Sequence, residues 1–193
     1  TVIVAIGAVG MTMIIVSGGI DLSVGSTIAL TSVATALALH RAWPPMAAIL
    51  AAIALGGFVG MVNGVVITTL RVVPFIATLG MLGVARGLAK WVAGEMTVQA
   101  PETWINELAV TFPSQAWLVV APGVWLALGL AVLASFGLTR TVFGRHAFAI
   151  GSNEIAARAC GIAVTQMKIA IYSLAGCAFG LAGVMQMSRL RQG

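Results

Sequence analysis

The chain has 193 residues, of which 60% are hydrophobic and 8% are charged, and its mean hydropathy is +1.08. A soluble domain carries about 25% charged residues, so this composition excludes a soluble globular protein and indicates one that crosses a membrane several times. The formal net charge of +5 comes from Lys and Arg spread over the ends of apolar segments. Such residues anchor a chain at the membrane surface, and we expect membrane lipid and no nucleic acid as a partner.

Six apolar segments follow one another along the chain, each with a length suited to crossing a hydrocarbon core. They cover residues 1–17, 22–39, 46–70, 72–93, 117–138 and 169–187. None has the pattern of a β-strand. The sequence therefore predicts an all-α fold, a polytopic transmembrane helical bundle with six spans. The first residues contain no charged region and no initiator methionine, so we expect no signal peptide and a chain that begins inside a helix.

Asp21 is the only acidic residue among the first 94 positions, and it lies between the first two apolar segments. A carboxylate at the bilayer centre costs about 2.5–3.5 kcal/mol on insertion scales. Asp21 must therefore lie near the membrane–water interface, face a water-filled cavity or have a bonding partner. We predict that Gly18 or Gly19 ends one helix in the left-handed conformation and that Asp21 or Ser23 caps the next. A contact with a substrate or partner is the alternative.

Small residues recur at helical spacing in three segments, GGFVGMVNG at 56–64, GVARG at 83–87 and GCAFG at 176–180. In lipid such residues let helix backbones approach closely, and we interpret them as packing seams. Seams that slide during a conformational cycle are the alternative.

The cysteines and histidines give no sign of a special site. Cys160 and Cys177 are too few for a disulfide framework and are predicted to be free thiols. His40 and His146 have no Cys, His or acidic neighbours at metal-ligand spacing, so we predict no metal site.

The stretch 140–168 carries four of the ten basic residues, and within it SNEIAARACGI predicts a short helix. Good helix formers run from Glu154 through Ala159, Ser152 or Asn153 can serve as N-cap, and Gly161 can end the helix. A helix of two turns is marginal alone in water and needs a surface to pack on. A solvated connecting helix is the simplest interpretation from these residues alone.

Four stretches resemble, in the same order, the permease subunits of bacterial ABC importers for ribose, xylose, arabinose and related monosaccharides. They are GGIDLSVGS at 18–26, VNGVVITTLRVVPFIATLGMLGVARGLA at 62–89, GRHAFAIGSNEIAARACGI at 144–162 and YSLAGCAFGLAGV at 172–184. The resemblance spans nearly the whole chain. It implies one transmembrane permease domain over residues 1–193 with helices missing at both ends, a cytoplasmic coupling loop at 140–168, and a bacterial inner (plasma) membrane location.

The same resemblance implies the partners: a cytoplasmic ABC ATPase subunit, a second permease subunit, identical or different, and a periplasmic sugar-binding protein. The chain contains no G-x-x-x-x-G-K-[ST] phosphate loop, so we expect no cofactor and no catalytic residue in it. ATP and Mg would be bound by the ATPase.

Importers of this class carry an E-A-A-x-x-x-G loop whose helix docks on the ATPase. Ala156, Ala157 and Gly161 match its spacing, whereas the acid stands one place early, at Glu154. The resemblance therefore implies that these four residues form the ATPase-coupling surface, with Arg158 as a neighbouring polar contact.

Side chains within the predicted spans offer hydrogen-bond partners or an aromatic wall for a translocation path, although packing between helices is an alternative role for each. The chosen candidates are Asn63, Phe75, Thr78 and Tyr172. A permease for branched-chain amino acids, nucleosides or a signalling sugar stays open. An ion-gradient transporter or a membrane enzyme would need ionisable clusters inside the spans, which the sequence lacks.

Overall fold

The computed structural model describes residues 2–109, 121–190 and 192–193, and within these ranges the regular secondary structure is helical. The helices are α1 (Val2–Val16), α2 (Val24–His40), α3 (Pro45–Thr69), α4 (Pro74–Val92), the 3-10 helix η1 (Trp104–Ala109), α5 (Pro122–Arg140), α6 (Val142–Ser152), α7 (Glu154–Ala159) and α8 (Val164–Leu190).

The six predicted apolar segments correspond to α1, α2, α3, α4, α5 and α8, which confirms the polytopic helical bundle. Among the described helices, α3, α4, α5 and α8 are long and apolar enough to cross a membrane, whereas α1 and α2 are shorter apolar helices. Positions 117–120 of the fifth predicted segment lie outside the described residues. Proline occupies the first turn of α3, α4 and α5, where the missing N–H leaves no helical hydrogen bond unmade.

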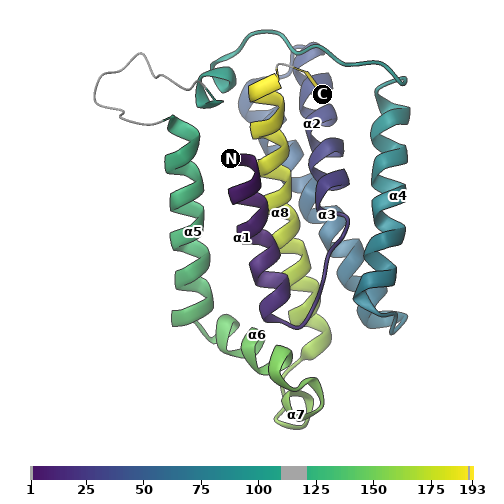
Figure 1. Cartoon of the computed structure of the whole chain (residues 1–193), viewed down its shortest axis with the longest axis vertical. Coiled ribbons are helices and arrows are strands. Elements are labelled where there is room, and N and C mark those ends of the chain that lie inside the picture. The colour runs from purple at the N-terminus through teal and green to yellow at the C-terminus, as the bar shows by residue number, and fades with distance from the viewer. Residues whose placement is uncertain (1, 110–120, 191) are drawn as a thin grey trace.

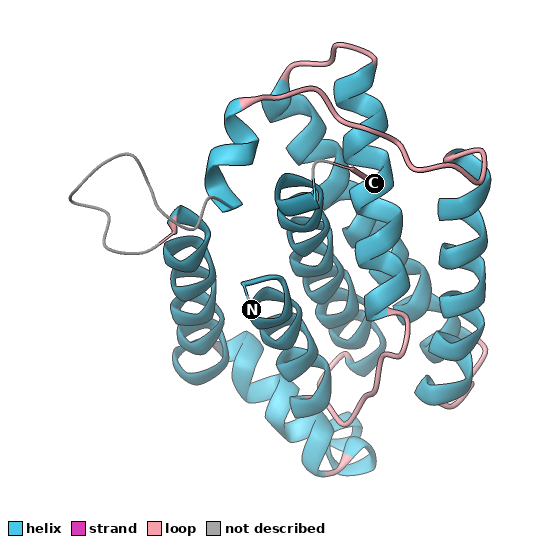
Figure 2. Ribbon diagram, turned by 45° about the horizontal axis from the view of Figure 1, so that its top comes forward, coloured by secondary structure: helices cyan, strands magenta, loops and turns pink. Residues whose placement is uncertain are grey.

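The bundle is arranged around α8, which packs against α1, α2 and α3 (Figure 1). Helices α4 and α5 lie on opposite flanks, and α6 and α7 cover one end. Most connections lie at the two ends of the bundle (Figure 2), but the link between α1 and α2 runs back along the side of the bundle before α2 begins. This link, residues 17–23, is called the 17–23 segment below.

The most extensive contact in the bundle joins α3 to α8, and glycines lie at its centre. A Cβ on Gly56 would meet the Gly176 carbonyl oxygen, and one on Gly60 would meet the Tyr172 carbonyl oxygen. Gly180 touches the Ala52 backbone in the same way. The predicted seams at 56–64 and 176–180 are thus two sides of one interface. By contrast, a Cβ on Gly83 or Gly87 would meet nothing within 4 Å.

We predict that Gly60→Ala in the full-length permease destabilises the bundle, because the added methyl group would push the α3 and α8 backbones apart. Overpacking of this kind costs about 1–3 kcal/mol, which should lower the thermal unfolding temperature by several degrees. Gly129→Ala in α5, a position with open space around it, is the matched control and should not lower it. Equal unfolding temperatures for both variants would contradict the packing described here.

Candidate functional site

Helix α6 leads from the membrane span α5 to the short helix α7. Thr141 is extended, and its side-chain oxygen accepts a hydrogen bond from the Gly144 nitrogen at 3.3 Å, which caps α6. The buried residues Gly144, Ala147 and Ile150 recur every three positions, so α6 packs one face on the bundle. The sequence analysis missed α6 because Arg145 and His146 gave the stretch a polar character. The three-residue spacing was the signal that could have found it.

Helix α7 has the predicted bounds, Glu154–Ala159, and forms for the predicted reasons. Asn153 is its N-cap, with the side-chain oxygen accepting from the Ala156 nitrogen at 3.0 Å. Gly161 has a φ of +84°, and the Gly161 and Ile162 nitrogens donate to the Arg158 and Ala157 carbonyl oxygens. This bond pair is the Schellman motif, which ends a helix at a left-handed glycine.

The residues expected on the ATPase-coupling surface divide between two faces of α7. Ala157 is 4% exposed and packs with Ile150 and Val164, so it faces the protein's own interior. Ala156 is exposed, and Ile155, which the sequence analysis did not select, is 84% exposed. The outward face of α7 is therefore apolar at Ile155 and Ala156. Ala157 lies on the opposite face and packs the helix against the rest of the protein.

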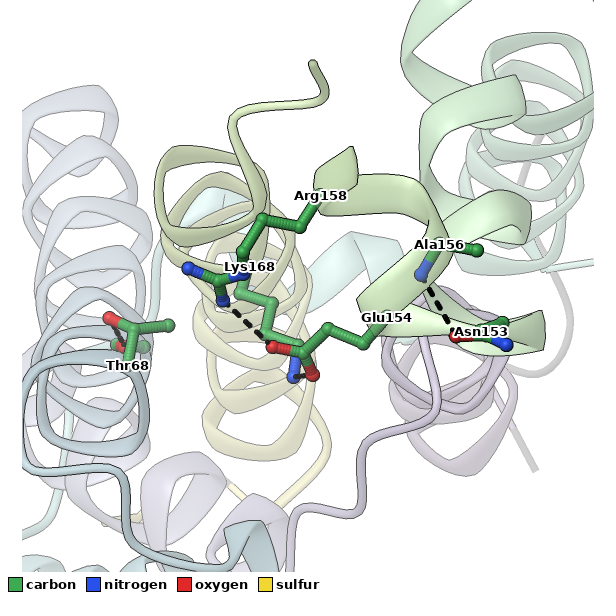
Figure 3. A network of polar contacts seen from close by, with 7 residues as sticks. Thr68, Asn153, Glu154, Ala156, Arg158 and Lys168 are labelled. Carbon is green, nitrogen blue, oxygen red and sulfur yellow. Dashed lines mark hydrogen bonds and ion pairs between the residues drawn. The ribbon is translucent and has the colours of Figure 1, made fainter. Parts of the chain in front are cut away.

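Glu154 forms ion pairs with two basic side chains of its own chain (Figure 3). Its Oε1 accepts from Arg158 Nη2 at 3.1 Å, and its Oε2 accepts from Lys168 Nζ at 2.6 Å. The hydrogen bond from Lys168 is the main cause that lowers the pKa of Glu154, and Arg158 contributes less. Lys168 lies in α8, so this pair joins the short helix to the central helix of the bundle.

Above this loop, the 17–23 segment begins where α1 ends. Gly18 has a φ of +77°, and the Gly18 and Gly19 nitrogens donate to the Ile15 and Ile14 carbonyl oxygens. The geometry is again a Schellman motif, with Gly18 in the left-handed conformation that the sequence analysis considered for Gly18 or Gly19. A Cβ on Gly19 would lie 2.5 Å from the Tyr172 hydroxyl oxygen, so Gly19 lets the segment approach α8 closely.

Asp21 is 4% exposed and lies in a polar cluster with Ser23 and Asn63. The Ser23 backbone nitrogen and hydroxyl donate to Asp21 Oδ1 at 2.7 and 2.6 Å. Asn63 Nδ2 donates to Ser23 Oγ at 3.1 Å and to Asp21 Oδ2 at 3.4 Å. Ser23 occupies the N-cap position of α2, as predicted, but it makes no side-chain capping bond, because its hydroxyl donates to Asp21 instead.

Three of the four residues selected for a translocation path surround the 17–23 segment. Besides Asn63, Thr78 Oγ1 accepts from the Leu22 nitrogen at 3.2 Å, and the Tyr172 hydroxyl donates to the Ile20 carbonyl oxygen at 3.3 Å. Phe75 is 49% exposed. An apolar groove of about 390 Å³ between α1, α3, α5 and α8 is lined by other residues. The role of the four in a path stays a prediction.

Both cysteines are free, as predicted: Cys160 is exposed on the α7 side of the loop and Cys177 is half-buried in α8. Within the described residues, no group of three or more His, Cys, Asp or Glu side chains could hold a metal ion.

These features define a helical membrane protein in which the connection between α5 and α8 folds into two helices, α6 and α7, at one end of the bundle. Residues 1–192 match the model of one family, described as the permease component of the branched-chain amino acid transport system. The chain belongs to that family.

Several relatives of the chain are sugar import permeases by name. The chain is 40% identical over 187 residues to the ribose import permease protein RbsC of Escherichia coli (strain K12), covering 96% of this chain and 58% of the relative. It is 39% identical to the RbsC of Bacillus subtilis (strain 168), covering 95% of this chain and 56% of the relative. It is 32% identical to the fructose import permease protein FrcC of Rhizobium meliloti, covering 97% and 54%.

The chain thus spans little more than half the length of the curated relatives it matches. No solved structure matches it.

We predict that Lys168→Met raises the pKa of Glu154 toward the ordinary glutamate value, and that Arg158→Met raises it less. Because Glu154 has a lowered pKa in the folded state, its contribution to stability is fully present above the ordinary pKa. That contribution is lost as the pH falls through the lowered value. A titration followed by ¹³C NMR of the labelled Glu154 carboxyl group would measure both variants. A larger shift in Arg158→Met would show that the Lys168 bond is not the dominant one.

Proposed function

We propose that this chain is the membrane-spanning part of a permease subunit in an ATP-driven ABC importer of the bacterial inner membrane. The pathway would open to one side of the membrane at a time, through alternating access. The family match over residues 1–192 and the relatives named as import permeases support this proposal.

The solute we propose is a monosaccharide of the ribose, xylose or arabinose class. The names ribose import permease and fructose import permease among the relatives favour a sugar. The family description names branched-chain amino acids, and another relative is the autoinducer 2 import system permease protein LsrC of Klebsiella pneumoniae, 35% identical over 92% of this chain. An amino acid, a nucleoside or a signalling sugar is therefore the alternative solute.

The single observation that carries the coupling proposal is the exposed face of α7. Ile155, at 84% exposure, is on a six-residue helix at the end of the bundle beyond α5 and α6. Burying an isoleucine side chain is worth about 1.5–3 kcal/mol, so this position favours contact with a partner. In the proposal, Ile155 and Ala156 contact the ATPase with Arg158 beside them. Glu154, Ala157 and Gly161 hold the helix in place.

The other partners follow from the same proposal. ATP and Mg would be held by the ATPase below α7, and a second permease subunit would complete the pathway in the membrane. A periplasmic sugar-binding protein would deliver solute at the opposite end, where the stretch between α4 and η1 lies. Within the described residues, that end carries Glu95, Glu102 and Glu107.

A transporter driven by an ion gradient is the functional alternative from another class. The buried carboxylate of Asp21 is the one observation in its favour, because intramembrane acids can carry protons. However, Asp21 already accepts hydrogen bonds from Ser23 and Asn63, which favours a structural role.

We predict that Ile155→Glu in the full-length permease, expressed with its ATPase and binding protein, abolishes ribose uptake and co-purification of the ATPase. The charge would be placed in an apolar contact while the fold stays intact, since the side chain is exposed. Met96→Glu is the matched control, because Met96 is 75% exposed and follows the C-terminal end of α4, which lies at the end of the bundle opposite α7 (Figure 1). It should retain the ATPase at equal membrane expression.

Three results would contradict the proposal. If the wild-type permease retains no ATPase, an ATP-driven importer is excluded. If uptake stops with a protonophore but survives ATP depletion, the protein is a gradient-driven transporter. If the protein takes up leucine but not ribose, it is still an ABC importer, but the proposed monosaccharide solute is wrong.

A further inference from the structure

Lys168 lies where the α6–α7 loop meets the central helix of the bundle. Helix α8 has 27 residues, about 40 Å at 1.5 Å per residue, which exceeds a hydrocarbon core of about 30 Å. Its first turns therefore extend toward the end of the bundle that carries α7. Lys168 is in the second of these turns, and its side chain is 15% exposed.

The two bonds to Glu154 differ in environment. The Arg158 side chain is 62% exposed and pairs with Glu154 within α7, an arrangement worth a few tenths of a kcal/mol in water. The Lys168 bond is shorter, less exposed and joins two different helices. Figure 3 shows the Glu154 carboxylate reaching from α7 to the Lys168 side chain on α8. Lys168 is therefore the partner that fixes where α7 sits.

One helical turn further along α8, Tyr172 reaches the 17–23 segment. Residues four apart lie on the same helix face, so Lys168 and Tyr172 point to the same side of α8. Tyr172 is 1% exposed, and its hydroxyl donates to the Ile20 carbonyl oxygen at 3.3 Å. A displacement of the first turns of α8 would therefore reach the backbone next to Asp21.

The α6–α7 corner also touches the 17–23 segment directly. A Cβ on Gly151 would meet the Val16 carbonyl oxygen and lie 3.1 Å from the Gly18 nitrogen, so the two backbones are in contact. The far side of the segment is held by Asn63 of α3 and Thr78 of α4. The segment thus lies between the loop that carries α7 and three helices of the bundle.

We propose that Lys168 is a positioning residue that makes α7 and α8 move as one body, so that force on α7 is transmitted to the 17–23 segment through Tyr172. This inference rests on the proposed function, because it assigns a role to α7 after an ATPase has docked. The exposed face of α7 makes the contact with the partner, and Lys168 converts the contact into movement inside the bundle.

The test compares three full-length permeases assembled with their ATPase and binding protein in proteoliposomes: wild type, Lys168→Met and Lys168→Arg. Arg140→Met, which removes an exposed basic residue at the end of α5, is the matched control. Solute transported and ATP hydrolysed are measured in the same vesicles, together with the amount of ATPase retained. Electron spin resonance between labels on Cys160 and on residue 20, in a background without other cysteines, reports whether α7 and the segment still move together.

Lys168→Met should retain the ATPase and hydrolyse ATP while transporting less solute per ATP, by about fivefold or more, the lower end of typical coupling between sites. The distance between the two labels, which stays constant in wild type because α7 and the segment move together, should then change with ATP. Lys168→Arg, which keeps the charge, should restore most of the coupling, and Arg140→Met should resemble wild type.

A Lys168→Met protein that transports with wild-type efficiency would overturn the inference and leave the proposed function standing. Equal losses in Lys168→Met and Arg140→Met would also overturn it, because the effect would then follow net charge. If Lys168→Met does not fold, Lys168→Gln and Lys168→Arg take its place in the comparison. If both fold and neither differs from wild type in solute per ATP, the inference fails. If the wild-type permease binds no ATPase, the proposed function itself is wrong.

Discussion

The structure depends on one close contact, the glycine interface at which the α3 and α8 backbones touch. Lipid offers no hydrophobic drive for helices to associate, so close packing of small residues has to hold such a bundle together. With α3 and α8 joined in this way, α1 and α2 can pack on the remaining sides of α8. The same contact places Asn63 of α3 and Tyr172 of α8 on either side of the 17–23 segment.

That segment brings irregular backbone into the body of a membrane protein, and its polar groups are therefore engaged with neighbouring helices. The Ile20 carbonyl oxygen accepts from Tyr172, and the Leu22 nitrogen donates to Thr78. Asp21 is held by Ser23 and Asn63. Non-helical backbone at membrane depth is tolerated only where protein or water satisfies it, so these contacts explain why an aspartate is found in so apolar a sequence. The segment is also the point at which the α6–α7 loop touches the bundle.

Sequence reasoning found the six apolar helices and the bounds of α7, because hydropathy and capping are local properties of the chain. It missed α6, where Arg145 and His146 obscured the spacing of Gly144, Ala147 and Ile150. It selected Asp21 and Asn63 but could not predict that they bond to each other across 42 positions, because that contact depends on how α3 packs on α8. It likewise placed Ala157 on the docking surface, since spacing alone does not tell which face of a short helix is buried.

The central claim is that the outward face of α7 meets an ATPase, and in-cell photo-crosslinking tests it most directly. A photoreactive amino acid would replace Ile155 in the full-length permease, and Met96 at the opposite end would be replaced in a parallel strain. We expect position 155 to cross-link to a protein identified by mass spectrometry as carrying a phosphate-binding loop, and position 96 to give no such product. An ATPase product from position 96, or none from position 155 when the permease is folded and active, would contradict the account.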